Sequence, residues 1–468
     1  MRASNLRRSK LTIRLNTEKV FILLSFIVSA AIRWIPEAQF PYIIGFDTPL
    51  YLEFGKHYAF YPSPFLIFNG ILGVLYAAKL DLLQVMKYLP TLVYGLLGVS
   101  IYMFSIKNLK WSAQKALMAA LNASLSVALL RMSWDMHKLT LGIALILFTL
   151  SYVNELNKIK NKIIFTTLGL LAILSHELIM IIFLSTLLAI TITKNQTGKK
   201  LIVPLLITGI VVFLGIWYRN ILNYVFDWIP RIVQAPLFSN ILTELQNNGG
   251  FILKLYAFLI PLAIIGFFKN TLLSTWLALT ALGSISTAIT PSFMLGGVLP
   301  WRYVLLLTIP LSFYSISGII KIVEKVQTKT VITILLILIV NIGSFSFLGI
   351  VNGLNFYETE GIIPKNMVQT SIPVYDITPT ITLSKNVPND ATLLVQGDFV
   401  GFTAYCTDAK IIGFGGTYNI APTLQQALEA VHDNNNLYLL WWDDYAAQQI
   451  GFKIISYNGN LRLYKYNQ

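Results

Sequence analysis

The sequence has few charged residues and almost no cysteine. Asp, Glu, Lys and Arg make up 12% of the 468 residues, which is about half of the share in a typical soluble domain. Cys406 is the single cysteine, so the chain has neither an internal disulfide nor a cysteine-based zinc site. Internal repeats and low-complexity tracts are lacking too, which argues against a repeat architecture.

Hydrophobic residues account for 55% of the chain and gather in long uninterrupted runs. Each run approaches the roughly 17–25 residues of a transmembrane helix, so the bilayer is the expected solvent of a mostly α-helical, polytopic protein with about eleven spans. The runs are 20–35, 88–106, 113–130, 138–154, 163–175, 177–193, 201–217, 252–268, 271–290, 302–320 and 330–350.

Basic residues explain the net charge of +14 and predict the orientation of the chain. Lys and Arg form short clusters between the runs, which is the positive-inside pattern and not the basic face of a nucleic-acid-binding protein. Every cluster becomes cytoplasmic if the apolar segment 64–80 stays outside as an interfacial helix. The N-terminus is then inside, on an uncleaved first span, and the C-terminus is outside. The expected outer segments are 36–87, 131–137, Ser175–Glu177, 218–251, 291–301 and the chain after 351.

The composition changes after Val351, where Pro, Gly, Asn and Asp return. This predicts a transmembrane domain at 1–351 and an extracytoplasmic α/β domain at 352–468, the latter with a core of about 80–100 residues. A helix is expected at 422–433, where Thr423 is placed to cap it. Strands are expected at 391–396, 409–413, 437–442, 452–457 and 461–466.

The first outer loop contains three ionisable residues close together, Asp47, Glu53 and His57. A carboxylate such as Asp47 could act as a general base or bind a divalent cation. Alternatively, Asp47 is a solvated acid that caps a helix beginning at Thr48.

Two further polar segments interrupt the apolar runs. The first contains Arg131, Asp135, His137 and Lys138 around a tryptophan. Interfacial anchoring explains Trp134 and Lys138, but it explains the acid and the histidine less well.

The second segment is Ser175-His176-Glu177. An ionisable pair at membrane depth is costly, so His176 and Glu177 should face protein or a cavity; a tight polar turn is the alternative.

Arg302 lies at the start of a span, next to Tyr303. A guanidinium there can hold a phosphate through two hydrogen bonds. Taken as an isolated residue, Arg302 is better explained by snorkelling to lipid headgroups. One topology nevertheless places all of these ionisable residues on the outer side. A transporter more often keeps such residues at the bilayer midplane, so the pattern favours a reaction at the outer surface.

These features together resemble the GT-C glycosyltransferases, which include protein O-mannosyltransferases, aminoarabinose transferases and oligosaccharyltransferases. The resemblance covers most of the chain. It is based on an acid soon after the first span, the interfacial helix entered through Tyr61-Pro62-Ser63-Pro64, the Arg302-Tyr303…Ile309-Pro310-Leu311-Ser312 run, and the segment Val387–Leu394 at the start of an outer domain.

The resemblance implies a membrane enzyme of the cell envelope. It would transfer a sugar, with inversion, from a polyprenyl-phosphate donor to a glycan, lipid or protein acceptor, without nucleic acid. Asp47 would be the base or would bind a divalent metal such as Mg or Mn. Arg302, with Arg131 or Lys138, would contact the donor phosphate.

Two alternatives remain open. One is an oligosaccharyltransferase, whose outer domain carries a Trp-Trp-Asp-Tyr-Gly motif. Residues 441–445 here read Trp-Trp-Asp-Asp-Tyr, so Trp441, Trp442 and Asp443 match while an extra acid and a missing glycine do not. Aromatic packing at a strand end explains the same residues. The other alternative is a lipid or polysaccharide transporter, or a non-catalytic scaffold.

Overall fold

The structure is a computed structural model, and part of the chain is described. The expected loops 218–251 and 291–301 lie mostly outside the described residues, as do Tyr61–Pro64 and Asp443–Tyr445. The described residues are 2–58, 66–193, 202–212, 214–215, 246, 249–250, 252–253, 255–289, 300–324, 326, 328–351, 370–415, 423–431, 436–442, 447 and 450–466.

The chain divides into two compact units, each built from segments that are distant in sequence. The first, the helical unit, comprises Met1–Ile35, Pro64–Phe68 and Pro90–Gly353. The second, the α/β unit, comprises Pro36–Ser63, Asn69–Leu89 and Leu354–Gln468. Most of the first expected outer loop therefore folds together with the C-terminal segment.

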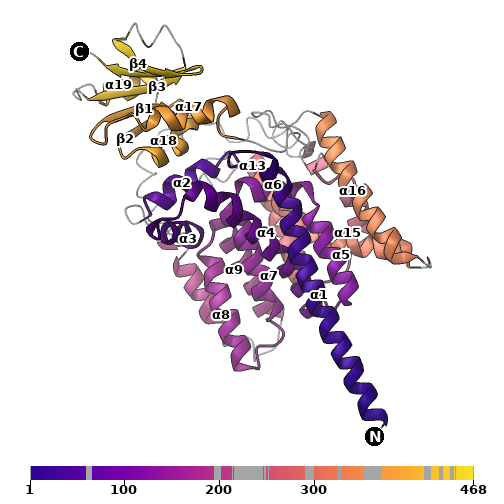
Figure 1. The fold of residues 1–468 in the computed structure, drawn as a ribbon. Coiled ribbons are helices and arrows are strands. Elements are labelled where there is room, and N and C mark those ends of the chain that lie inside the picture. Colours follow the sequence, from indigo (N-terminus) through magenta and orange to yellow (C-terminus); the bar gives the residue numbers. More distant parts are fainter. Residues whose placement is uncertain are drawn as a thin grey trace. The chain divides into compact units, whose positions relative to one another are not determined.

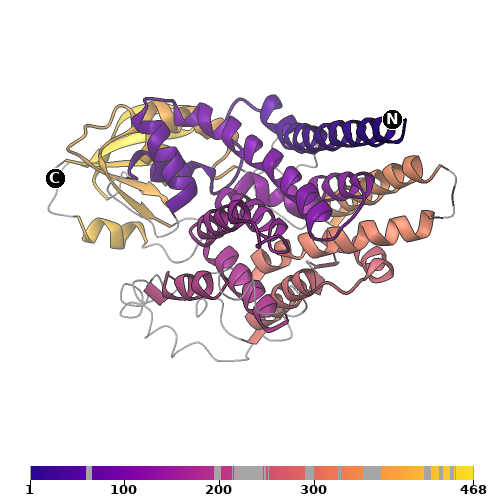
Figure 2. The same ribbon diagram turned by 90° about the horizontal axis from the view of Figure 1, so that it is seen from below.

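Every apolar run that was expected to cross the bilayer contains a helix, as predicted. In two views the helices of the helical unit gather into one bundle (Figures 1 and 2). They lie at α1 (Arg2–Gln39), α4 (Leu82–Lys107), α5 (Ala113–Ser124), α6 (Val127–Asp135), α7 (His137–Ser151), α8 (Ile159–Ile173), α9 (Glu177–Thr193), α12 (Leu259–Gly266), α13 (Thr271–Ile289), α14 (Pro300–Leu306), α15 (Thr308–Val323) and α16 (Lys329–Val351), with a further helix at Ile202–Val212.

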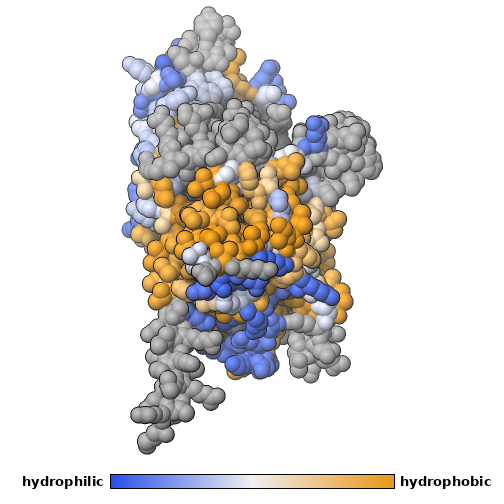
Figure 3. Space-filling model, turned by 90° about the vertical axis from the view of Figure 1, so that its right-hand side faces the viewer, coloured by the Kyte–Doolittle hydropathy of each residue, from blue (hydrophilic) through white to orange (hydrophobic). Residues whose placement is uncertain are grey.

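Helix length and composition support a membrane location. Among the described residues, Glu18–Ala38, Leu82–Lys107 and Arg302–Val323 are long and apolar enough to cross a bilayer. The pair α5 and α6, bent by 61°, adds a fourth candidate if it is one broken span. Apolar side chains such as Ile192 and Leu282 are 74% and 64% exposed, and a hydrophobic belt covers the helices on the face shown in Figure 3. Such a surface fits lipid as the solvent.

Buried polar side chains join helices inside the helical unit. Asn122 of α5 donates from Nδ2 to the carbonyl of Ser312 (3.2 Å) and to Oγ of Ser315 (2.9 Å), both in α15. Asn341 of α16 donates in turn to Oδ1 of Asn122 (3.2 Å). Hydrogen bonds of this kind hold helices together where lipid removes the hydrophobic drive for association.

The α/β unit contains a five-stranded mixed sheet in the order β2-β1-β3-β5-β4. β1 pairs in parallel with β2 and β3, whereas β5 pairs antiparallel with β3 and β4. All five expected strands are confirmed: β1 (Thr392–Gln396), β2 (Lys410–Phe414), β3 (Leu437–Trp442), β4 (Phe452–Asn458) and β5 (Leu461–Tyr466).

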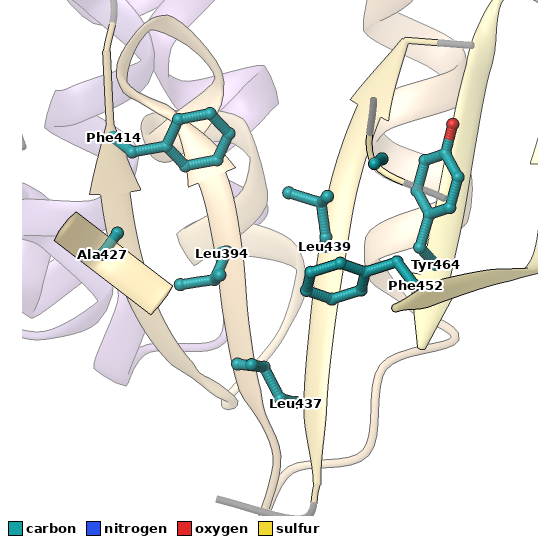
Figure 4. Close-up of a cluster of buried hydrophobic side chains, with 8 residues drawn as sticks. Leu394, Phe414, Ala427, Leu437, Leu439, Phe452 and Tyr464 are labelled. Carbon is teal, nitrogen blue, oxygen red and sulfur yellow. The ribbon is translucent and has the colours of Figure 1, made fainter. Parts of the chain in front are cut away.

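Helices pack on this sheet and complete its core. α19 (Leu424–Glu429) begins with the predicted Thr423 cap, in a capping box with Gln426, but is shorter than the predicted 422–433. Its Ala427 packs in a cluster with Leu394, Leu439 and Tyr464 (Figure 4). The sequence did not predict α17 (Val374–Ser384) and α18 (Val400–Cys406).

The first outer loop contributes two helices, α2 (Thr48–Lys56) and α3 (Leu66–Ala77). The 12 residues of α3 are too few to span a bilayer, and Ile71 and Val74 are exposed on it. Both facts suit the predicted interfacial helix.

One expected loop is wrong. Segment 131–137 is helical except at Met136, because α6 continues through Asp135 and α7 begins at His137. The physical reason is the spacing of Arg131 and Asp135. On a helix they are one turn apart, and they form a buried ion pair.

Candidate active site

The Asp47 turn is built by a glycine and a threonine. Gly45 has φ of 116°, a conformation that a side chain would strain, and it forms a parallel bridge with Thr370. Thr48 donates from Oγ1 to the carbonyl of Ile44 at 2.7 Å. These bonds fix the backbone on both sides of Asp47.

Asp47 occupies the N-cap position of α2, as the capping alternative requires, but its side chain makes no capping hydrogen bond. The carboxylate is half-buried.

Glu53 and His57, the other candidates of this loop, lie on α2 and at its C-terminal end. Burial raises the pKa of Glu53. Burial, followed by the neighbouring Lys56 ammonium, lowers the pKa of His57. Both effects favour the neutral forms. Neutral Glu53 is an acid, whereas the neutral imidazole is the basic form of His57, so His57 stays a candidate base beside Asp47.

A second group of candidates comes together in the helical unit. His176 and Glu177, in the turn between α8 and α9, both interact electrostatically with Arg302 and Lys138. Tyr303 interacts with Glu177 as well. These residues lie on or beside α7, α9 and α14, and more than a hundred positions separate Glu177 from Arg302. We call His176, Glu177, Lys138 and Arg302 the cationic cluster.

Hydrogen bonding sets the charge of this cluster. His176 Nδ1 accepts the backbone N–H of Leu178 at 3.1 Å, so the ring is neutral with its hydrogen on Nε2. The 3.4 Å approach of Nδ1 to Oε2 of Glu177 is then not an ion pair. Among these four residues two cations face one carboxylate, a set of side chains that suits an anion such as a phosphate.

Arg131 and Asp135 are not in this cluster. They pair with each other along α6, with side chains that are 8% and 3% exposed. Their neighbour His137 is buried, and its ring stacks on Phe68 with centroids 5.5 Å apart. The predicted phosphate contact of Arg131 therefore competes with its ion pair to Asp135.

Arg33 is a buried cation that sequence reasoning did not select. It is 0% exposed, donates from Nη1 to Oγ1 of Thr91 at 3.3 Å, and interacts electrostatically with His137 and Tyr94. Its position near the end of an apolar run could have marked it as a candidate, because ionisable residues inside membrane segments are usually functional.

A cluster of side-chain ligands for a divalent metal is not seen among the described residues. They contain no group of three or more His, Cys, Asp and Glu side chains placed to bind one ion. A Mg or Mn site at Asp47 stays a prediction.

The tryptophan pair at the end of β3 packs among aromatic rings. Trp441 contacts Phe414 with centroids 5.1 Å apart, and Trp442 contacts Phe399 at 5.2 Å. Trp442 also donates its indole N–H to Oδ2 of Asp376 at 2.8 Å. This arrangement supports the packing explanation for both rings.

Comparison with known proteins identifies the fold. ArnT from Cupriavidus metallidurans, in a structure bound to undecaprenyl phosphate, superimposes with a TM-score of 0.54 at 10% sequence identity, over 94% of this chain and 97% of ArnT. The chain shares the fold of ArnT. It also resembles the arabinofuranosyltransferase AftD from Mycobacteria, with a TM-score of 0.54 and 11% identity, over 96% of this chain but 40% of AftD.

An oligosaccharyltransferase from Archaeoglobus fulgidus, in complex with zinc and sulfate, is similar at a TM-score of 0.49 and 12% identity, over 90% of this chain and 67% of that one. No protein-family model and no curated protein sequence matches the chain. The GT-C fold that the sequence resembles is thus confirmed at the level of structure.

Proposed function

We propose that this protein is a membrane glycosyltransferase that takes its sugar from a polyprenyl-phosphate donor. The observation that supports the proposal most is the cationic cluster, within a fold shared with ArnT, whose structure holds undecaprenyl phosphate. A lipid phosphate is the anion that a membrane protein meets at the end of its helices. The acceptor is a glycan, a lipid or a protein.

In the proposed reaction, the acceptor hydroxyl or amide attacks the anomeric carbon from the side opposite the phosphate. The bond between that carbon and the phosphate oxygen breaks, and its electron pair stays on the phosphate. Asp47 takes the acceptor proton, while Arg302 and Lys138 stabilise the charge that develops on the leaving group. Inversion at the anomeric carbon follows from the single displacement.

We further propose that this reaction occurs on the extracytoplasmic face. The support is the distribution of basic clusters in the sequence, which the positive-inside rule assigns to the cytoplasm. The C-terminal segment, the first loop and Asp47 then lie outside, in a chain with about eleven spans.

The test has two arms, both on purified protein in nanodiscs. In the binding arm, undecaprenyl phosphate is titrated against wild type and Arg302→Ala. Loss of charge-assisted hydrogen bonds should weaken binding by about 1.5–3 kcal/mol, or roughly 10- to 100-fold. Lys321→Ala is the control, because Lys321 at the end of α15 donates to the carbonyl of Ile265 and should leave binding unchanged.

In the transfer arm, tritium-labelled undecaprenyl-phosphate-linked pentoses and hexoses are offered with lipid, glycan and peptide acceptors. A labelled covalent product supports the enzyme. Movement of the donor across the bilayer without a covalent product supports a transporter instead and contradicts the proposal.

A further inference from the structure

Lys56, in the last turn of α2, uses its ammonium group to hold the end of a distant helix. Its Nζ donates to the carbonyls of Ala404 (3.1 Å), Tyr405 (3.2 Å) and Thr407 (2.8 Å), at and just beyond the C-terminal turn of α18. An ammonium has three N–H donors, and Nζ shares them among these three carbonyls and the carboxylate of Asp408. Helix ends leave such carbonyls without partners, and a cation there also opposes the helix dipole.

The partner segments are far apart in the chain. The three bonds join positions separated by 348 to 351 residues, yet the Lys56 side chain is only 10% exposed. The acid Asp408 also pairs with Nζ at 2.7 Å, but it is 63% exposed. Solvent therefore weakens that ion pair, whereas the three bonds to the carbonyls are partly buried.

A second contact fixes the opposite end of α2, where Asp47 lies. A Cβ added to Gly401 of α18 would collide with the backbone of Pro49 and Leu50. The two helices therefore touch backbone to backbone, two residues after Asp47. Because Lys56 holds one end of α2 and Gly401 the other, α18 sets both the position and the direction of the helix that follows Asp47.

We propose that α18 holds α2 in place and that Lys56 is a positioning residue for the Asp47 carboxylate. The inference rests on the proposed function. It assigns to the C-terminal segment the task of holding the first loop in a geometry that permits catalysis. A misplacement of about 1 Å can cost roughly 100-fold in rate, so a general base benefits from such a support.

The test compares Lys56→Met with Asp408→Asn in the full-length protein in nanodiscs. Lys56→Met keeps most of the side-chain volume but removes the three bonds, whereas Asp408→Asn removes only the exposed ion pair. Lys56→Met should raise amide hydrogen exchange in residues 44–57 and lower kcat in the transfer assay at least 10-fold, with undecaprenyl phosphate affinity and donor KM within twofold of wild type. Asp408→Asn should change each quantity less than twofold.

A second variant guards against simple misfolding. Gly401→Ala leaves Lys56 intact but separates the helices near Asp47, and it should also lower kcat without changing donor KM. Hydrogen exchange across β1, β3 and β5 reports in every variant whether the sheet stays folded.

The outcomes separate this inference from the proposed function. If wild type transfers sugar and both Lys56→Met and Gly401→Ala keep its kcat while the sheet stays folded, the positioning role is overturned alone. If these variants lose undecaprenyl phosphate affinity together with kcat, the positioning role is also overturned, because the contacts between α2 and α18 would then affect donor binding. If wild type transfers no sugar, the proposed function fails, and the positioning role fails with it.

Discussion

The indole N–H of Trp442 donates to the buried carboxylate of Asp376, with 2.8 Å between Nε1 and Oδ2. Asp376 lies in the first turn of α17 and is 0% exposed. Trp441 packs with the cluster on the α19 side of the sheet, and alternation along β3 turns Trp442 to the other face, toward α17. The second tryptophan of the Trp-Trp-Asp sequence thus connects the sheet to α17.

Removal of this donor should destabilise the α/β unit. Trp442→Phe keeps an aromatic ring but leaves Oδ2 of a buried acid without its bond, which should cost about 1–3 kcal/mol. In an Asp376→Asn background the same change should cost less, because no charge is left to stabilise. Hydrogen exchange of β3 and β5 in the full-length variants measures both costs. If Trp442→Phe costs the same stability in both backgrounds, the loss comes from packing of the ring and not from the hydrogen bond.

Asp376 should also make this unit more stable at mildly acidic pH. Burial raises the pKa of Asp376 above its ordinary value of 3.8, and the Trp442 hydrogen bond only partly offsets the effect. The folded state therefore binds the proton more tightly than the unfolded state, so stability falls as pH rises from about 3.8 through the folded pKa. Asp376→Asn should remove this slope when exchange protection is compared between pH 4.5 and 7. If the pH dependence of stability is unchanged in this variant, a group other than Asp376 causes it.

Asn122 should matter for the stability of the helical unit. Its side chain bonds to α15 and accepts from Asn341 of α16, so Asn122→Ala removes contacts between three helices. Individual bonds of this kind are worth about 0.6 kcal/mol in membranes, with a maximum of about 1.7 kcal/mol.

The matched control is Thr149→Ala, because the Thr149 hydroxyl bonds within its own helix, to the carbonyl of Leu145. Unfolding in bicelles should show a larger loss for Asn122→Ala than for this control. Equal losses would mean that the hydrogen bonds between helices contribute no specific stability.

The proposed sidedness predicts which cysteines an impermeant reagent reaches in intact cells. In a Cys406→Ser background, cysteines at the exposed positions Lys79 and Asn389 should be labelled. A cysteine at Lys160, which is also exposed but belongs to a cytoplasmic basic cluster, should be labelled only after the cells are opened. If only the cysteine at position 160 is labelled in intact cells, the orientation is the opposite of the proposed one.

Sequence periodicity predicted most of the secondary structure because lipid and sheet packing each impose a regular pattern. The runs became helices, and all five strands appeared within a residue or so of their expected positions. The sequence did not predict α17, because Pro379 and several threonines have low helix propensity. Segment 131–137 was expected to be a loop because its charges were counted singly, although Arg131 and Asp135 neutralise each other.

The sequence singled out candidate site residues one at a time, but it did not show how they group. The sequence drew attention to Asp47 and Arg302 because ionisable residues are rare near the apolar runs. It could not show that Asp47 belongs to the α/β unit and Arg302 to the helical unit. The bonds between Lys56 and α18 depend on contacts across some 350 positions, which leave no local signal.

The initial rate of covalent sugar transfer by wild type and by Asp47→Asn, at saturating undecaprenyl-phosphate-linked donor, tests the central claim most directly. Asparagine keeps the shape of the side chain and removes the base. Wild type should form labelled product, and Asp47→Asn should form it about 10²- to 10⁴-fold more slowly, with undecaprenyl phosphate affinity within twofold of wild type. Wild-type protein that binds undecaprenyl phosphate but forms no covalent product with any donor and acceptor would contradict the account.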